Sequence, residues 1–275
     1  MRKITQSLFL AANLLGFAGR AHAAHAGTAD RLYVTDCGWA HSEDQSLWSP
    51  GVNVGAPIDL ADNCYLIHHG TDGYLLWDTG ITDQLVALAN GQRTAPLRQT
   101  WHRDNTLAAA LTAIGIKPAD VRYVAISHLH PDHVGNLGLF PDATVILQKA
   151  EWDYAGSLPQ NPFAAVAKTE LITGDKDLFG DGSVVILATP GHTPGHQSLL
   201  VRLSNTGTVL LTGDAVHFQA NWDNRRVPSF NTDKDRTLAS MQRIADFLAR
   251  EQAKLWINHD KPSSDTRRHA PDFYD

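Results

Sequence analysis

Cysteine, methionine and basic residues are scarce in this sequence. Its 275 residues include two Cys and two Met, and 23 Lys and Arg stand against 29 Asp and Glu, for a net charge of −6. Two Cys cannot form a disulfide framework, and Cys37 and Cys64 lack the C-x-x-C spacing of a thiolate zinc site. The shortage of positive charge argues against a protein that binds nucleic acids through their phosphates. Histidine is the abundant reactive residue instead, with 14 copies.

The chain also lacks any segment that would divide it. Hydrophobic residues make up 43% and charged residues 19%, which allows a full core and excludes wholesale disorder. There is no Pro/Ser/Gly-rich linker, low-complexity tract or short repeat. We therefore expect one domain over residues 27–275.

The apolar run at the N-terminus is too short to span a membrane comfortably. A short basic start precedes a mostly apolar stretch over residues 4–19, and Arg20 ends it. Two small-x-small triplets follow, which predicts a secretory signal peptide over residues 1–23, cut after Ala23 or Ala26. Its removal would take away three basic residues and no acidic residue, so the net charge would become −9. We expect export to a periplasm or beyond, with no stable membrane anchor.

Export would make a disulfide between Cys37 and Cys64 chemically feasible. Both residues lie in apolar, strand-like runs, so two buried thiols fit the sequence at least as well. The sequence leaves the pairing open.

Apolar patterning predicts strands in both halves of the chain, with helices between them and after them. The expected strands are 32–36, 64–68, 74–77, 121–126, 144–147, 184–187, 198–203, 209–211 and 255–257. Asp72 and Gly73 supply a hairpin turn. One helix is expected after an Asp104 cap, and the longest is expected to begin at Thr232 or Asp233. Such an order indicates an α/β fold with two packed sheets and helices outside.

The densest group of metal-competent side chains follows the expected strand at 121–126. The segment after Ser127 reads H-L-H-P-D-H, an H-x-H-x-D-H pattern. A turn there can point His128 and His130 one way and Asp132 and His133 another. Imidazole and carboxylate are ligands for Zn, Fe, Co or Mn, and the lack of thiolates argues against a closed structural zinc site.

Three further candidate ligands follow other expected strands: His192 in T-P-G-H, Asp214 in L-T-G-D and His259 in W-I-N-H. If Asp214 bridges, the seven side chains form two metal sites. The first holds His128, His130 and His192, and the second holds Asp132, His133 and His259. Each site keeps room for solvent, as a catalytic site requires. We expect two divalent ions, with Zn favoured over Fe, Co or Mn.

This pattern resembles the metallo-β-lactamase superfamily and, within it, the N-acyl-homoserine lactonases that quench quorum sensing. The gaps of 59 residues from His133 to His192, 22 to Asp214 and 45 to His259 are similar to those of that group, as is W-D-T-G at 77–80. The resemblance covers nearly all of residues 27–275. It implies a four-layer αβ/βα sandwich with a dinuclear centre at its edge, and it does not by itself fix the substrate.

One position departs from the resembled family. In many such lactonases a Tyr three residues after the bridging Asp contacts the lactone carbonyl, and here that position is His217. His can also donate a hydrogen bond to an oxyanion, and its charge can change near neutral pH. We therefore expect His217 to polarise the carbonyl, with a changed substrate range and pH profile.

Other residues are expected to support the site rather than bind metal. Asp78 and His196 are the candidates for holding the ligands through hydrogen bonds. Six aromatic residues are expected in loops: Trp39, Trp48, Trp101, Phe218, Trp222 and Phe230. All of these except Trp101 are candidates for lining an apolar pocket that holds an acyl chain.

The leading hypothesis is a secreted dinuclear lactonase that opens N-acyl-homoserine lactones to N-acyl-homoserines. A hydroxide held between the metals attacks the lactone carbonyl. One metal and His217 stabilise the oxyanion, the other metal binds the leaving ring oxygen, and Asp132 shuttles the proton as general acid.

Alternative enzymes share the metal site. A β-lactamase fits export, but those enzymes as a group lack a bridging Asp at the position of Asp214. A glyoxalase-II-like thioesterase or an organophosphate triesterase stays open, because both keep a similar ligand set. The complete ligand set argues against a non-catalytic metal-binding relative. The metal identities, the acyl-chain length and the oligomeric state, a homodimer included, also stay open.

Overall fold

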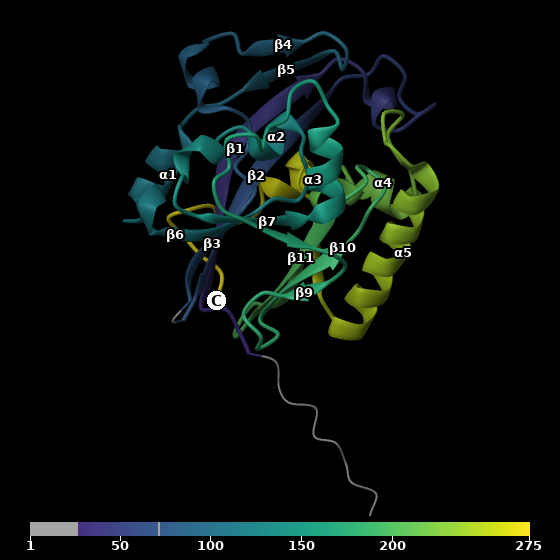
Figure 1. Cartoon of the computed structure of the whole chain (residues 1–275). Helices are drawn as coiled ribbons and strands as arrows, with labels where there is room; N and C mark the ends of the chain where they lie inside the picture. The colour runs from purple at the N-terminus through teal and green to yellow at the C-terminus, as the bar shows by residue number, and fades with distance from the viewer. Residues whose placement is uncertain (1–26, 71) are drawn as a thin grey trace, which may run out of the picture.

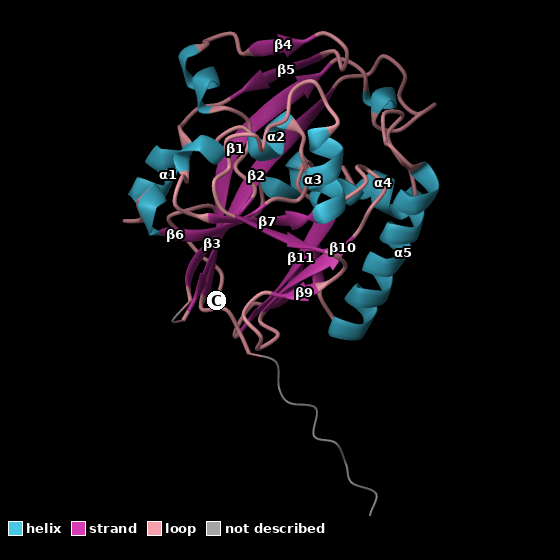
Figure 2. Cartoon of the chain, in the orientation of Figure 1, coloured by secondary structure: helices cyan, strands magenta, loops and turns pink. Residues whose placement is uncertain are grey.

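Two β-sheets pack face to face, and helices cover their outer faces (Figure 1 and Figure 2). The computed structural model describes residues 27–70 and 72–275, so the predicted signal peptide lies outside the described residues. The larger sheet has eight strands in the order β4-β5-β1-β2-β3-β6-β7-β8. The smaller has five strands in the order β13-β12-β11-β10-β9.

The strands and helices have the following bounds. The larger sheet contains β1 (Arg31–Ser42), β2 (Ile58–His69), β3 (Gly73–Trp77), β4 (Gln92–Thr94), β5 (Gln99–His102), β6 (Val121–Ala125), β7 (Thr144–Gln148) and β8 (Thr169–Ile172). The smaller sheet contains β9 (Lys176–Asp177), β10 (Val184–Ala188), β11 (Gln197–Leu203), β12 (Gly207–Leu211) and β13 (Lys254–Trp256). The helices are α1 (Leu107–Ala113), α2 (Pro131–Val134), α3 (Lys149–Gly156), α4 (Gln219–Asn224), α5 (Lys234–Glu251) and α6 (Lys261–Ser264).

Three hydrophobic layers hold the sheets and helices together. Val34, Ile67 and Trp77 of the larger sheet share one buried cluster with residues of β10, β11 and β12 in the smaller sheet. On the outer face of the larger sheet, strand residues pack against Leu107 and Leu111 of α1. On the outer face of the smaller sheet, strand residues pack against α5. Each fully buried aliphatic side chain contributes about 1.5–3 kcal/mol relative to exposure. The expected four-layer αβ/βα sandwich is confirmed.

The first two strands are much longer than the sequence pattern predicts. β1 and β2 have 12 residues each and pair antiparallel from Arg31 opposite His68 to Ser42 opposite Ile58. Polar residues such as Asp59 and Asn63 interrupt the apolar pattern that marks a strand. The short β4–β5 hairpin, which extends this sheet beyond β1, has no clear apolar pattern either.

The two predicted helix starts have different outcomes. Asp233 caps α5, because its side chain accepts a hydrogen bond from the backbone N–H of Arg236 at 2.9 Å, as expected. The predicted Asp104 cap is wrong. Thr106 directly precedes the first helical residue of α1, and its hydroxyl accepts from the backbone N–H of Ala109 at 3.1 Å.

Cys37 and Cys64 form a disulfide between β1 and β2, which resolves the alternative left open by the sequence. Cys37 lies at a β-bulge, where the register shifts between Asp36 and Gly38. The covalent link therefore fixes the two strands together at the point where their regular pairing is interrupted.

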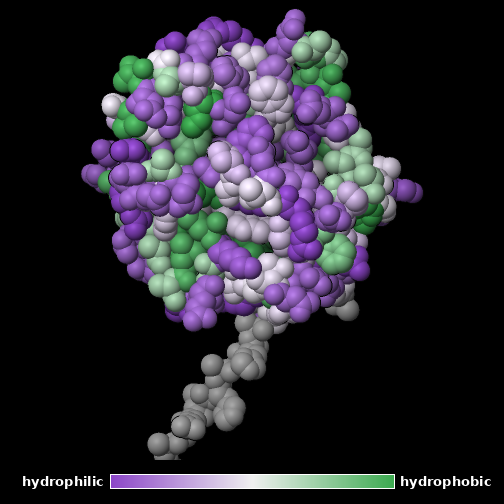
Figure 3. Space-filling model, turned by 180° about the vertical axis from the view of Figure 1, so that it is seen from behind, coloured by the Kyte–Doolittle hydropathy of each residue, from purple (hydrophilic) through white to green (hydrophobic). Residues whose placement is uncertain are grey.

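Polar residues dominate the face of the molecule seen from behind (Figure 3). The back face is mainly hydrophilic, with hydrophobic patches scattered over it (Figure 3). Among the described residues, the exposed large hydrophobic side chains are Val54, Val86, Leu88 and Leu171. Within the same part of the chain, no helix has both the length and the apolar character needed to cross a membrane.

Candidate metal centre

The loops that follow four strands carry all seven predicted metal ligands. The segment from His128 to His133 follows β6 and enters α2, whereas His192, Asp214 and His259 follow β10, β12 and β13. Each loop leaves the C-terminal end of its strand. Because β6 belongs to the larger sheet and the other three strands to the smaller one, the ligands converge at a common edge of the sandwich.

The seven side chains form two groups that share Asp214. One group is His128, His130, His192 and Asp214, and the other is Asp132, His133, Asp214 and His259; the ligand atoms of each group lie within 4.8 Å of one another. Oδ2 of Asp214 lies 3.8 Å from Nε2 of His128 and 3.5 Å from Nε2 of His192. Oδ1 lies 3.3 Å from Nε2 of His133 and 3.0 Å from Nε2 of His259. Oδ2 also lies 3.2 Å from Nε2 of His259. The carboxylate thus lies between the two groups and contacts both, as a bridging ligand requires.

The residues of each group approach one another as ligands of a common ion do. Nδ1 of His130 lies 2.9 Å from Nε2 of His128 and 3.0 Å from Nε2 of His192. Oδ2 of Asp132 lies 3.6 Å from Nε2 of His259. Nδ1 of His130 carries either one proton or one lone pair in a neutral ring, so it cannot form a full hydrogen bond with both His128 and His192. A cation among the three lone pairs satisfies all of them at once.

Buried atoms without partners test whether the residues fit metal ions. Nε2 of His133 and Oδ1 of Asp214 are buried and have no hydrogen-bond partner within residues 27–70 and 72–275. Leaving such atoms unsatisfied costs about 1–3 kcal/mol each. Both atoms point into the second group, and a divalent cation there would satisfy both. The donor set of imidazoles and carboxylates therefore fits two divalent ions.

Electrostatics differ between the two groups. Burial lowers the pKa of His128 and His192 well below the usual value, so both rings are neutral and offer lone pairs. For His133, burial acts in the same direction, but the carboxylates of Asp214, Asp78 and Asp132 outweigh it and raise the pKa well above 6.5. Burial of His259 is likewise outweighed, chiefly by Asp214, and its pKa rises to about 9. Without metal, the second group therefore holds protons where an ion would bind.

Second hydrogen bonds orient most of the ligand rings. Nδ1 of His133 donates a hydrogen bond to Oδ2 of Asp78 at 2.8 Å. Asp78 thus supports a metal-ligand candidate, as the sequence predicts. Nδ1 of His192 donates to Oδ1 of Asn231 at 2.9 Å, and Nδ1 of His259 donates to the carbonyl of Ala61 at 2.7 Å. Each bond leaves Nε2 of the ring free to face the centre, which fixes the tautomer of a metal ligand.

His196, also expected to support the site, lies directly behind the bridging carboxylate. Its Nε2 accepts a hydrogen bond from the backbone N–H of Asp214 at 2.9 Å. Gly213 makes this approach feasible: a Cβ there would lie 2.8 Å from Nε2 of His196, and its φ of +52° favours glycine. The turn therefore requires glycine directly before Asp214, because any larger residue would collide with the ring of His196.

Three supporting residues are not identified by the sequence pattern. The hydroxyl of Ser127 donates to Oδ2 of Asp78 at 2.8 Å and lies 3.0 Å from Nδ1 of His128. Asn231 orients His192, as described above. Glu151 of α3 is fully buried, and its carboxylate accepts from the backbone N–H groups of Leu129 at 2.9 Å and of Gly195 at 2.9 Å.

Glu151 therefore ties together two loops that carry metal ligands. Burial raises the pKa of this carboxyl, while its hydrogen bonds act in the opposite direction. A single Glu in a short helix has no sequence signature for this role. The role of Glu151 is recognised from its burial beneath both loops, which is known only once the fold is known.

The predicted contact of His217 with a lactone carbonyl stays a prediction, and the structure shows only where the ring lies. The side chain is fully buried, and its Nε2 lies 3.1 Å from Oδ2 of Asp214. Burial lowers the pKa of His217, so the ring is neutral. The ring also lies beside Trp48, with 5.0 Å between the ring centroids. His217 thus lies beside the bridging carboxylate and is not among the residues that line the pocket described next, and neither of its ring nitrogens has a hydrogen-bond partner among the described residues.

A pocket of about 280 Å³ opens beside the two groups. Its lining combines metal-site residues with an apolar wall: Trp48, Ile81, Thr94, Leu97, Gln99, Trp101, His130, Pro131, Asp132, Asp214 and Phe230. Of the predicted pocket residues, Trp48 and Phe230 are therefore in place. Trp101 also lines the pocket, although the sequence pattern did not make it a candidate. An apolar wall beside polar catalytic groups is typical of a small-molecule site.

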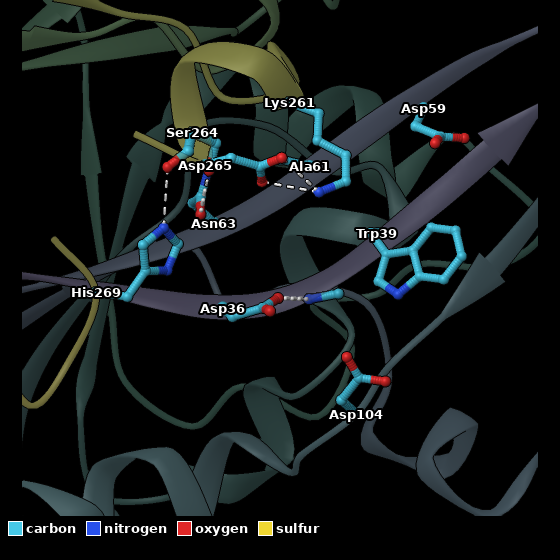
Figure 4. A pocket seen from close by; sticks show the side chains of 11 residues that line it. Asp36, Trp39, Asp59, Ala61, Asn63, Asp104, Lys261, Ser264, Asp265 and His269 are labelled. Carbon is cyan, nitrogen blue, oxygen red and sulfur yellow. Dashed lines mark hydrogen bonds and ion pairs between the residues drawn. The ribbon is translucent and has the colours of Figure 1, made fainter. Parts of the chain in front are cut away.

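Three predicted pocket residues lie elsewhere. Trp39 lies on β1 and lines a separate hollow, where Figure 4 shows it above Asp104; none of the seven metal-ligand candidates lines that hollow. Phe218 is buried in a cluster with Trp48, behind the pocket lining. Trp222 lies on α4 and packs with residues of the outer face of the smaller sheet and of α5. Trp39, Trp101 and Trp222 lie in regular elements, so the expectation of loops is wrong for them.

The chain is similar to known proteins over most of its length. Residues 58–253 match the profile of the metallo-beta-lactamase superfamily. The N-acyl homoserine lactonase AttM of Rhizobium radiobacter is 32% identical over 260 residues, covering 89% of this chain and 98% of that protein. The N-acyl homoserine lactonase AiiA of Bacillus thuringiensis subsp. kurstaki is 29% identical, covering 90% and 99%.

Solved structures that are similar to this chain include N-acyl homoserine lactone hydrolases, the same activity that is named for the sequence relatives. An N-acyl homoserine lactone hydrolase with the product N-hexanoyl-L-homoserine bound at its catalytic metal centre has a TM-score of 0.80 and 28% identity, covering 90% of this chain and all of that one. A variant of the Bacillus thuringiensis lactonase with N-decanoyl-L-homoserine bound gives the same TM-score and identity. The fold, the paired donor groups and these similarities agree, and the chain belongs to the N-acyl homoserine lactonases of the metallo-β-lactamase superfamily.

Proposed function

We propose that this protein is a metal-dependent hydrolase that opens the ring of N-acyl-homoserine lactones. The observation that carries the proposal is the position of Asp214, which is shared by both donor groups and also lines the pocket. A substrate in that pocket lies against the metal site on one side and an apolar wall on the other. The substrates named for the related lactonases have a polar ring and an apolar chain, which match these two sides.

Two divalent ions, Zn first among the expected metals, would be held by the two donor groups, and when bound they would activate a water at neutral pH and polarise the lactone carbonyl. Asp132 is the candidate general acid, because its side chain is 15% exposed and lines the pocket. From there it would take a proton from the attacking water and pass it to the ring oxygen as the C–O bond breaks. The buried Asp214 and His196 keep the donor groups in position, and Nε2 of His217 lies 3.1 Å from Oδ2 of Asp214.

The apolar part of the pocket gives the second half of the proposal. Trp48, Trp101 and Phe230 would hold the acyl chain and exclude water from the reacting end. Trp48 and Phe230 pack edge to face, with 4.8 Å between their centroids, which stiffens this wall.

A substrate panel tests the proposal. Zinc-loaded protein would be assayed with N-hexanoyl-homoserine lactone, nitrocefin, a thioester and paraoxon, each with a chelated control. We expect chelator-sensitive opening of the lactone and little turnover of the other three compounds. Cleavage of the β-lactam, thioester or triester with an inert lactone would refute the lactonase proposal and retain a metallohydrolase. No turnover of any compound by metal-saturated protein would favour a non-catalytic relative.

We also propose that the protein is exported. The signal-peptide pattern of residues 1–23 and the Cys37–Cys64 disulfide support this, since disulfides persist in oxidising compartments. N-terminal sequencing of protein from fractionated cells checks it. A mature chain that begins at Ala24 or Gly27 outside the cytoplasm is the expected result, and an uncut cytoplasmic chain would contradict it.

A further inference from the structure

The side chain of Gln99 is buried beside the metal site without hydrogen bonds. Gln99 is 1% exposed, and neither Oε1 nor Nε2 has a hydrogen-bond partner among the residues that the structure describes. Its backbone, in contrast, is paired within the sheet, opposite Ser42 on β1 and Thr94 on β4. Buried polar atoms in native proteins nearly always have partners, so two free atoms on one side chain indicate a partner that is absent here.

The strand geometry directs this side chain to the pocket. Side chains alternate between the two faces of a strand, so Gln99 and Trp101 share one face of β5. Both line the pocket that contains Asp132 and Asp214. The ring of Trp101 lies 6.5 Å from that of the predicted metal ligand His259, measured between centroids. Gln99 therefore lies on the strand face that is turned toward the metal centre.

The composition of the pocket lining points to a polar group of the substrate as the partner of this amide. Apart from the metal-site residues and Thr94, the lining of the pocket is apolar. Gln99 offers one strong acceptor and two donors, carries no charge and is not a ligand of either donor group. It suits a neutral hydrogen-bonding group that lies between the reacting end of a substrate and its apolar end. A secondary amide is such a group.

We infer that Gln99 recognises the amide of the N-acyl chain, and so distinguishes acylated homoserine lactones from alkyl lactones that have no amide. This inference rests on the proposed lactonase function. Oε1 would accept from the amide N–H or Nε2 would donate to the acyl carbonyl. Only one of these bonds forms at a time, because the N–H and C=O of a trans amide point in opposite directions.

The test compares two lactones that differ in the amide. Wild type and the Gln99→Met variant would be assayed with N-hexanoyl-homoserine lactone and with γ-decalactone. Methionine keeps the length of the side chain and removes both polar atoms. We expect kcat/KM for the acylated lactone to fall about 10-fold to 100-fold, chiefly through a higher KM, because a hydrogen bond to a buried polar group is lost. The value for γ-decalactone should stay within about twofold, since it has no amide to lose.

A matched control lies one residue away on the same strand. Thr100 points to the opposite face of β5 and is absent from the pocket lining, so Thr100→Val should change neither value. Gln99→Leu provides a second apolar variant if Gln99→Met fails to fold, and the melting temperature and metal content of each variant would be measured. Calorimetric binding of the product N-hexanoyl-homoserine should weaken in parallel with kcat/KM.

The outcomes separate this inference from the proposed function. An equal fall for both lactones would assign Gln99 a structural role and overturn the inference. No change for either lactone would also overturn it. Wild-type protein that opens neither lactone would refute the lactonase function itself, and the inference with it.

Discussion

The buried ring of His196 accepts a hydrogen bond from the backbone N–H of Asp214, with 2.9 Å between the two nitrogens. The other ring nitrogen, Nδ1, donates to the carbonyl of Thr189 at 3.0 Å, so the proton resides there and Nε2 is the acceptor. Burial lowers the pKa of His196 to about 3, so the ring stays neutral at physiological pH. His196 therefore fixes the backbone of the bridging carboxylate without itself binding an ion.

Replacing His196 with Ala should loosen the metal centre. The backbone N–H of Asp214 would lose its acceptor, and the carboxylate would lose its fixed direction. We expect metal affinity to fall about 10-fold to 100-fold, the usual range for a residue that supports a ligand. Competition with a chromogenic chelator measures it. His41→Ala is the control, because the side chain of His41 is 48% exposed and pairs with Asp59 away from the pocket. Equal affinities in His196→Ala and wild type would contradict this role.

Metal binding should release protons from the second donor group. In the metal-free protein the pKa of His259 is about 9 and that of His133 is also raised, so both rings are protonated at pH 7.5. An ion must displace both protons, and we expect a release of about two per chain. A raised pKa means that a proton competes with the ion at any pH below that pKa. Metal affinity should therefore rise with pH from neutrality to about 9. Calorimetry in buffers of different ionisation enthalpy counts the protons. Binding with no proton release would contradict the assignment.

Removing the disulfide should lower thermal stability. Cys37 and Cys64 are 27 residues apart, and closing a loop of this size contributes about 3 kcal/mol to the free energy of unfolding. For a domain of this length that corresponds to a fall of about 6–12 °C in Tm. The double variant Cys37→Ala, Cys64→Ala should show the decrease, and reductant should lower the Tm of wild type by a similar amount. Reductant should leave the double variant unchanged. A wild-type Tm that is insensitive to reductant would contradict the prediction.

The metal ligands could be predicted from the sequence because residue type and short-range spacing are enough to identify them. His128, His130, Asp132 and His133 lie within six residues, and the other three follow apolar runs that are readable as strands. The structure brings all seven together. The sandwich itself was predictable for the same reason, since β6, β10 and β12 are short and mostly apolar.

The pocket could not be predicted in the same way. Gln99 and Trp101 belong to β5, a four-residue strand that contains three polar residues and has no apolar alternation. Glu151 and Asn231 act through burial and hydrogen bonds that exist only after distant loops meet. His217 occupies a position known from a family resemblance, but its direction depends on packing against Trp48 and Asp214. Residue type alone carries none of this information.

The most direct test of the account is a metal titration of the metal-free protein, with hydrolysis of N-hexanoyl-homoserine lactone followed at each addition. The two donor groups share Asp214, so full activity should need both ions. We predict no hydrolysis without metal and a plateau at two ions per chain. Full activity in the metal-free protein, a plateau at one ion, or no hydrolysis at saturation would each contradict a lactonase that works through a dinuclear centre.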